Sequence, residues 1–316
     1  MKILGTPTRE PTAIERSKER SIFGAILADI VIVILQTFAA ITSGSFTMLG
    51  ECVRAAFMTI IEIFSTVILR GVHRDRFGHF EFGIGKVEQF AWLVFGISLI
   101  ASGLWVATQV IGSLGSPERA AGPLGLAIAA IVNAINLMIN GLSLRALLAA
   151  SEERESDVFR AQVLTRSIKF SNSIVLQILL TLAAISTDPL FAHLLDVIGA
   201  TIVVVVMLHS GVSMVASAMP ALLDAPLPPT MVDRVRTALA TDPVSGPWIA
   251  ALRSRSSGRF PQVEVTVNRH HVHDPDWERN LDRLQTLVHE IDPAIELRIV
   301  VDKEPRESAP DNPAPV

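Results

Sequence analysis

Long apolar runs fill the first two thirds of the chain, and shorter alternating patterns follow them. A helix needs about 20 mostly apolar residues to cross a hydrocarbon core of roughly 30 Å. Six stretches reach that length, and we expect each to be a transmembrane helix: 22–43, 46–72, 88–112, 124–148, 163–186 and 191–219. The first run is longer than the apolar part of a signal peptide and five more follow it, so it is predicted to be an anchor.

Proline marks the end of the last apolar run. Pro226, Pro228 and Pro229 do not continue a helix, because proline lacks an amide proton and clashes with the preceding turn. Beyond them the period of the apolar positions changes between the helical and the strand repeat. The pattern predicts a helix, two strands, a helix and a strand, at 231–240, 248–253, 263–267, 277–291 and 295–299. This order indicates a compact two-layer domain.

Composition agrees with a membrane protein that carries an appended domain. Half of the 316 residues are hydrophobic and 18% are charged, whereas soluble domains carry about 25% charged residues. The predicted fold class is therefore an α-helical membrane protein with six transmembrane helices and a small α+β domain in the order αββαβ. The expected divisions are an N-terminal segment 1–21, a membrane domain 22–225, an αββαβ domain 226–305 and a disordered tail 306–316.

Positive charge predicts the orientation, because lysine and arginine are enriched in cytoplasmic loops. They gather before the first span, after the second and around the loop after the fourth, while the alternate connections hold only Arg119. Both termini are thus expected in the cytoplasm, with the chain in the cell membrane as a multi-pass protein. No basic stripe indicates nucleic acid, and the single cysteine, Cys52, excludes a disulfide framework. We see no nucleophile–base pair or phosphate loop, so no enzymatic activity is predicted.

Polar residues inside the spans are the candidates for function, because burying charge in lipid is costly. In the second span, steps of three and four residues place one polar stripe on a single helical face: Glu51, Arg54, Met58, Glu62 and Ser65. The fifth span carries a similar stripe: Gln162, Thr165, Arg166, Lys169, Asn172 and Ser173. Other polar residues stand in the first, fourth and sixth spans: Asp29, Asn133, Asn136, Asn140 and Asp196. The asparagines either line a path or hold helices together.

Two motifs resemble the cation diffusion facilitator family. The segment 82–88, which contains Gly85, Lys86 and Glu88, is similar to the family's F-G-x-G-K-x-E signature after the second span, and 43–49 is similar to its S-x-S-x-x-L-L entry to that span. Asp196 and Asp224 fall at the family's usual separation, and the resemblance covers roughly residues 20–305. It implies a homodimeric exporter of divalent metals such as zinc, manganese or iron, usually driven by protons.

The sequence departs from this family at the intramembrane metal site. Aligned through the flanking motifs, the four family ligands fall on Arg54, Met58, Thr165 and Lys169. Divalent metals favour imidazole or carboxylate ligands, and two of these four residues are cationic. We therefore expect no divalent metal in the membrane domain. The candidate residues of a transport pathway are Glu51, Arg54, Met58, Glu62, Thr165, Lys169 and Asp196.

These departures leave two functional hypotheses. In the first, the protein is a cation-efflux-type transporter with a replaced central site, where Lys169 and Arg54 supply the charge that a metal supplies in relatives. Glu51, one turn from Arg54, is the nearest candidate counter-ion, and Glu62 is the other. In the second, it is a structural or regulatory membrane relative that keeps the fold, dimerises and does not transport.

Histidines in the C-terminal domain are weak candidates for a peripheral metal site. If 270–273 continue a strand, His271 and His273 share one face. Asp302 and Glu304, near the end of the domain, share a face in the same way. Together they form a potential ligand set, and the alternative, which we favour, is a solvated strand end with surface histidines.

Overall fold

The computed structural model describes residues 10–77, 84–114, 121–149, 157–244, 246–256 and 261–302. The chain divides into two compact units. The first consists of Met1–Phe77 and Val94–Val215, and the second of Gly78–Leu93 and Ala216–Val316. Each unit is described by itself below. The domain boundary expected at residue 225 stays a prediction, and the tail lies outside the described residues.

The described part of the first two thirds is almost entirely helical, which confirms the predicted fold class. Its six long helices are α1 Ala13–Ser43, α2 Phe46–His73, α3 Gly85–Leu114, α4 Pro123–Ala149, α5 Asp157–Ile185 and α6 Pro189–Leu222. Five of them are long and apolar enough to cross a membrane. The described apolar run of α5 is shorter, Lys169–Ile185, because charged and polar residues occupy the first half of that helix.

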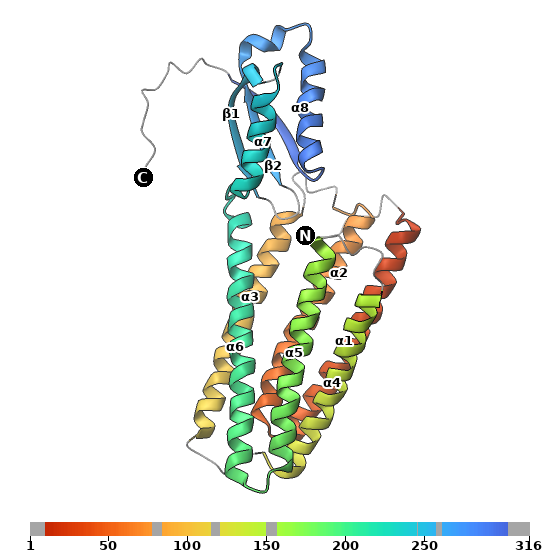
Figure 1. The fold of residues 1–316 in the computed structure, drawn as a ribbon, viewed down its shortest axis with the longest axis vertical. Coiled ribbons are helices and arrows are strands. Elements are labelled where there is room, and N and C mark those ends of the chain that lie inside the picture. Colours follow the sequence, from red (N-terminus) through yellow and green to blue (C-terminus); the bar gives the residue numbers. More distant parts are fainter. Residues whose placement is uncertain are drawn as a thin grey trace. The chain divides into compact units, whose positions relative to one another are not determined.

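Helices α1, α2, α4 and α5 form one side of the first unit (Figure 1). α1 packs against both α2 and α4, and α4 packs along α5. Elsewhere α3 and α6 approach closely where two glycines face each other. A Cβ added to Gly96 would lie 2.9 Å from the carbonyl oxygen of Gly211, so only glycine permits this backbone contact. Small residues at such crossings are typical of helices packed in lipid.

The start of α2 is capped by a carboxylate from α6. Gly44, with φ +67°, turns the chain between α1 and α2, and Ser45 follows it. Asp196 accepts hydrogen bonds from Ser45 Oγ at 2.5 Å, from the Phe46 amide at 2.8 Å and from the Thr47 amide at 3.1 Å. The first amides of a helix have no partner within it, so an acceptor here stabilises the helix start. Asp196 thereby fastens one end of α2 to α6.

The C-terminal part has the predicted αββαβ order. It contains α7 Pro229–Thr241, β1 Ile249–Arg255, β2 Gln262–Val267, α8 Trp277–Ile291 and β3 Glu296–Val301. The sheet order is β1-β2-β3, with β1 antiparallel and β3 parallel to the central strand. Buried valines of β2 pack with apolar residues of both helices, including Leu239 and Leu284. The alternation in β2 therefore faces a two-layer core.

The prediction that the histidines continue a strand is wrong. β2 ends at Val267, and Arg269–His273 form a 3₁₀ helix, in which alternate residues do not share a face. The His271 ring instead stacks on the indole of Trp248, with centroids 4.7 Å apart. Glu304 lies outside the described residues. Within the described ranges no three His, Cys, Asp or Glu side chains gather as a metal set, and the peripheral site stays a prediction.

Candidate functional site

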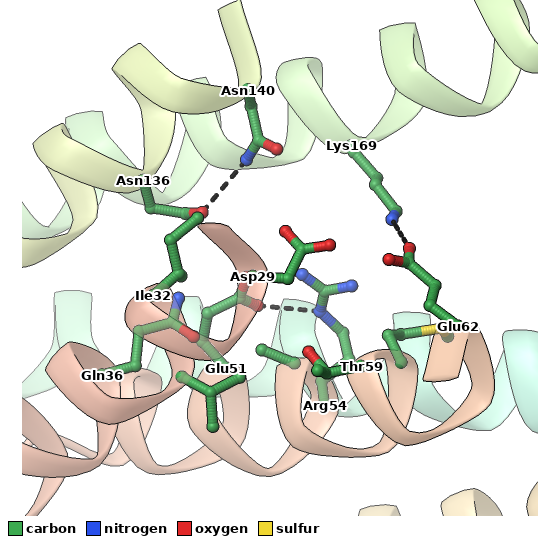
Figure 2. A pocket seen from close by; sticks show the side chains of 13 residues that line it. Asp29, Ile32, Gln36, Glu51, Arg54, Thr59, Glu62, Asn136, Asn140 and Lys169 are labelled. Atoms are coloured by element: carbon green, nitrogen blue, oxygen red, sulfur yellow. Dashed lines mark hydrogen bonds and ion pairs between the residues drawn. The ribbon is translucent and has the colours of Figure 1, made fainter. Parts of the chain in front are cut away.

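A cavity of about 40 Å³ lies among α1, α2, α4 and α5 within the first unit (Figure 2). It is large enough to admit water-sized groups, for which roughly 10–15 Å³ suffices. Most of the side chains that line it are charged or carry amides and hydroxyls, although the surrounding helices are strongly apolar. The lining residues are Asp29, Ile32, Val33, Gln36, Glu51, Arg54, Ala55, Met58, Thr59, Glu62, Asn136, Asn140 and Lys169.

Helix α1 contributes one wall through Asp29 and Gln36. The two residues are seven apart, which is two helical turns, so they lie on one face. Gln36 is fully buried, and neither its amide nitrogen nor its amide oxygen has a hydrogen-bond partner in the described part of the chain. The sequence analysis missed Gln36 as a site residue. Its spacing from Asp29 was the available signal.

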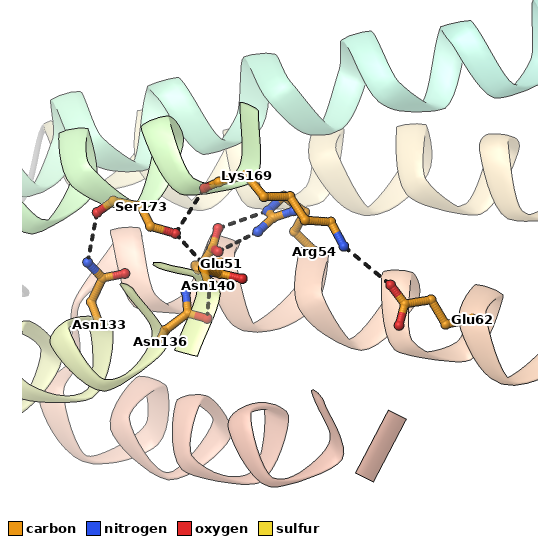
Figure 3. Close-up of polar contacts among 8 residues, drawn as sticks. All are labelled: Glu51, Arg54, Glu62, Asn133, Asn136, Asn140, Lys169 and Ser173. Carbon is orange, nitrogen blue, oxygen red and sulfur yellow. Dashed lines mark hydrogen bonds and ion pairs between the residues drawn. The ribbon is translucent and has the colours of Figure 1, made fainter. Parts of the chain in front are cut away.

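Helix α2 holds a tightly bonded ion pair. The guanidinium of Arg54 donates two hydrogen bonds to the carboxylate of Glu51, from Nε at 2.9 Å and from Nη2 at 2.5 Å (Figure 3). Glu51 is 1% exposed and Arg54 is 13% exposed. Such two-pronged contacts are among the strongest hydrogen bonds in proteins. The predicted counter-ion of Arg54 is thus confirmed, and the pair lies within a single helix.

A second ion pair joins two helices. Lys169 Nζ, from α5, donates to Glu62 Oε1, from α2, at 3.2 Å. About a third of each side chain is accessible, 33% for the lysine and 37% for the glutamate. The two carboxylates on α2 therefore serve different cations, Glu51 for Arg54 and Glu62 for Lys169. Figure 2 shows both pairs on the margin of the same cavity.

Asparagines of α4 connect this wall to α5 (Figure 3). Asn133 Nδ2 donates to the Ser173 carbonyl at 3.2 Å and to Gln177 Oε1 at 2.9 Å. Asn140 Nδ2 donates to Ser173 Oγ at 3.2 Å and to Asn136 Oδ1 at 3.2 Å. The bonds from Asn133 and Asn140 support the interpretation that the asparagines hold helices together, while Asn136 and Asn140 also line the cavity.

The predicted pathway residues are distributed unevenly. Five of them line the cavity: Glu51, Arg54, Met58, Glu62 and Lys169. Asp196 caps the first turn of α2. The side chain of Thr165 lies outside the described residues. The resulting centre alternates negative and positive groups, and its oxygen atoms include carboxylates and amides.

A further charged cluster lies beyond the apolar spans, where α1 meets the last turn of α2. Glu19, 4% exposed, accepts hydrogen bonds from Arg74 at 2.8 and 2.9 Å, faces His73 Nδ1 at 3.0 Å and lies 3.3 Å from Arg70 Nε. The hydrogen bonds from Arg74, helped by His73 and by the charge of Arg70, lower the pKa of Glu19 to about 2 against the effect of burial. The carboxylate of α1 is thereby tied to α2.

Comparison with known proteins identifies the helical part of the chain. A family model described as the cation efflux transmembrane domain matches residues 22–223. This stretch contains every residue that lines the cavity. Among the curated proteins there is no significant match.

Proposed function

This chain belongs to the cation efflux family, and on that premise we propose that it transports a cation through a central site that holds side-chain cations in place of metal ligands. Members of this family are transporters that act from a bundle of membrane-spanning helices. The observation that carries the proposal is the cavity, where charged groups converge among four helices. Charges buried within a membrane-spanning bundle usually mark an ion pathway, because their burial is costly.

The two ion pairs suggest different roles in this mechanism. Arg54 and Glu51 bind each other on one helix through two hydrogen bonds, so they keep a fixed positive group in the centre. Lys169 and Glu62 share a single contact between two helices, which a relative movement of α2 and α5 breaks. In our proposal, Lys169 neutralises Glu62 in the resting state and gives way when a cation arrives.

The assembly and orientation are part of the proposal. We expect a homodimer in the cell membrane with both termini in the cytoplasm, as the family resemblance and the loop charges imply. The positions that hold ligands in the resemblance carry Arg54, Met58, Thr165 and Lys169 here, so a divalent metal would meet cationic side chains. Repulsion between like charges in a medium of low polarity disfavours such binding.

A second candidate function is a membrane relative that keeps the fold without transporting. The specific observation in its favour is that Lys169 ties α5 to α2 and Glu19 ties α1 to α2. If these contacts are permanent, the bundle is locked and the protein acts through partners or as a dimer.

Flux into lipid vesicles separates the two functions. We would reconstitute the purified full chain and follow uptake driven by gradients of zinc, manganese, iron, cobalt, sodium and potassium. Transport that is lost in Glu62→Gln supports a pathway through the cavity. Arg236→Met is the control, because it removes one partner of an exposed pair with Asp233 in the C-terminal part. Absence of flux for every ion would reject transport in favour of the second function.

A further inference from the structure

We infer that the cavity exchanges one monovalent alkali cation for the proton of the Lys169 ammonium. This inference rests on the proposed transport function and specifies its substrate class. It is carried by three observations: the single accessible ion pair, the charge that this pair can exchange, and a buried amide that lacks a protein partner.

The first observation identifies the exchangeable group. Lys169 makes one contact with Glu62, and both side chains are about a third accessible. Arg54 makes two contacts with a fully buried carboxylate, and an arginine stays protonated under all ordinary conditions. A lysine ammonium, in contrast, readily loses its proton when its carboxylate partner is withdrawn. Among the described cations of the cavity, Lys169 is therefore the one suited to exchange.

The second observation is the charge balance of the exchange. When a cation binds Glu62, one N–H bond of the Lys169 ammonium breaks, and its proton passes to water. The amine that remains is neutral and keeps the electron pair of that bond. One positive charge thus leaves as another arrives, and no electron is transferred. A divalent ion would leave an additional positive charge beside Arg54, which is strongly unfavourable in a medium of low polarity.

The third observation concerns the ligands. Gln36 is fully buried, lines the cavity and has no hydrogen-bond partner in the described chain, so its amide oxygen is available to a ligand. Figure 2 shows Gln36 on the opposite part of the wall from Lys169. With Glu62, Asn136 and Asn140, the lining offers several oxygen atoms and no thiol or imidazole. Hard cations prefer oxygen ligands, and the volume of about 40 Å³ suits a small ion.

The test measures proton release during cation binding by the purified full chain. Sodium or potassium chloride would be titrated against choline chloride at constant ionic strength, in weak buffer with a pH indicator, while bound cation is measured by calorimetry. We expect about one proton released for each cation bound, because the two compete for one carboxylate. Lys169→Met should bind the cation at lower concentration without releasing a proton. Lys169→Arg should bind little, because its guanidinium keeps its charge.

Two further variants complete the test. Glu62→Gln should abolish cation binding, and Arg236→Met should behave as wild type because its pair with Asp233 is exposed and remote in sequence. Sodium or potassium binding that releases no proton in wild type would overturn the inference. So would vesicle flux of zinc or manganese that requires Glu62 while sodium and potassium drive none; that result would leave the transport function standing. Absence of flux for all ions would overturn the transport function as well.

Discussion

Two glutamates of the helical unit, Glu51 and Glu19, are almost completely buried, yet their partners come from different places. Glu51 is bound by Arg54 on its own helix, three residues away. Glu19 is bound by three basic side chains of another helix, more than 50 residues away. The first pair requires only that α2 is helical, whereas the second requires α1 and α2 to be packed together. Burial alone therefore does not reveal whether a charge stabilises a helix or an assembly of helices.

The largest effect is expected when the local pair is broken. Arg54→Met leaves the carboxylate of Glu51 buried without a counter-ion, which typically costs about 3–5 kcal/mol. The measurement is the thermal unfolding of purified protein in detergent. Adding Glu51→Gln should recover part of the loss because it removes the uncompensated charge. An unchanged melting temperature in Arg54→Met would show that Glu51 finds another partner.

A smaller loss is expected from the tertiary cluster. Glu19→Gln weakens the hydrogen bonds from Arg74 and should cost about 1.5–3 kcal/mol, the range for bonds to charged groups. The arginines remain partly accessible, so their charge is still solvated after the change. Glu10→Gln is the matched control, because its pair with Arg16 is exposed on both sides. Equal losses in the two variants would contradict the comparison.

The contribution of Glu19 should depend on pH. Its pKa is lowered from 4.5 to about 2 in the folded protein, so the folded state binds the proton more weakly than the unfolded state does. The stabilisation is then fully present above pH 4.5 and is lost as pH falls towards 2. The difference in melting temperature between wild type and Glu19→Gln should shrink over this window. A difference that grows on acidification would reverse the assigned sign.

The smallest effect on stability is expected at the pair that joins α5 to α2. Lys169→Met should cost roughly 1 kcal/mol or less, because the contact is single and both side chains are partly accessible. A double-mutant cycle with Glu62→Gln measures the coupling directly. A loss as large as that of Arg54→Met would mean that the pair is a permanent tether, which favours the locked bundle.

Much of the fold could be predicted from local patterns. Span lengths and the changes of period in the last 90 residues depend on neighbouring residues, so the helices and the αββαβ order appear in the sequence. The exception at 269–273 arises because alternation does not reveal that the chain turns after Asn268. The apolar run of α5 is shorter than expected because length and polarity compete in that helix.

The site was harder to predict because its contacts cross between helices. The partner of Arg54 is one turn away and follows from helical spacing, whereas that of Lys169 is 107 residues away and depends on how α5 packs. Gln36 was overlooked because an amide within an apolar run carries no charge. Asp196 was predicted as a pathway residue, and its hydrogen bonds to the start of α2 become visible only when α6 is placed beside that helix.

The cap formed by Asp196 also gives α2 a pivot. Helix α2 is held at Phe46, and Glu62 lies 16 residues further along it, about 24 Å from that fixed point. Rotation of a rigid rod of this length by about 5° displaces Glu62 by about 2 Å. The rod magnifies small angles, and α1, fastened near its far end through Glu19, travels with it. A tilt that barely disturbs the turn at Gly44 is therefore enough to part Glu62 from the lysine opposite.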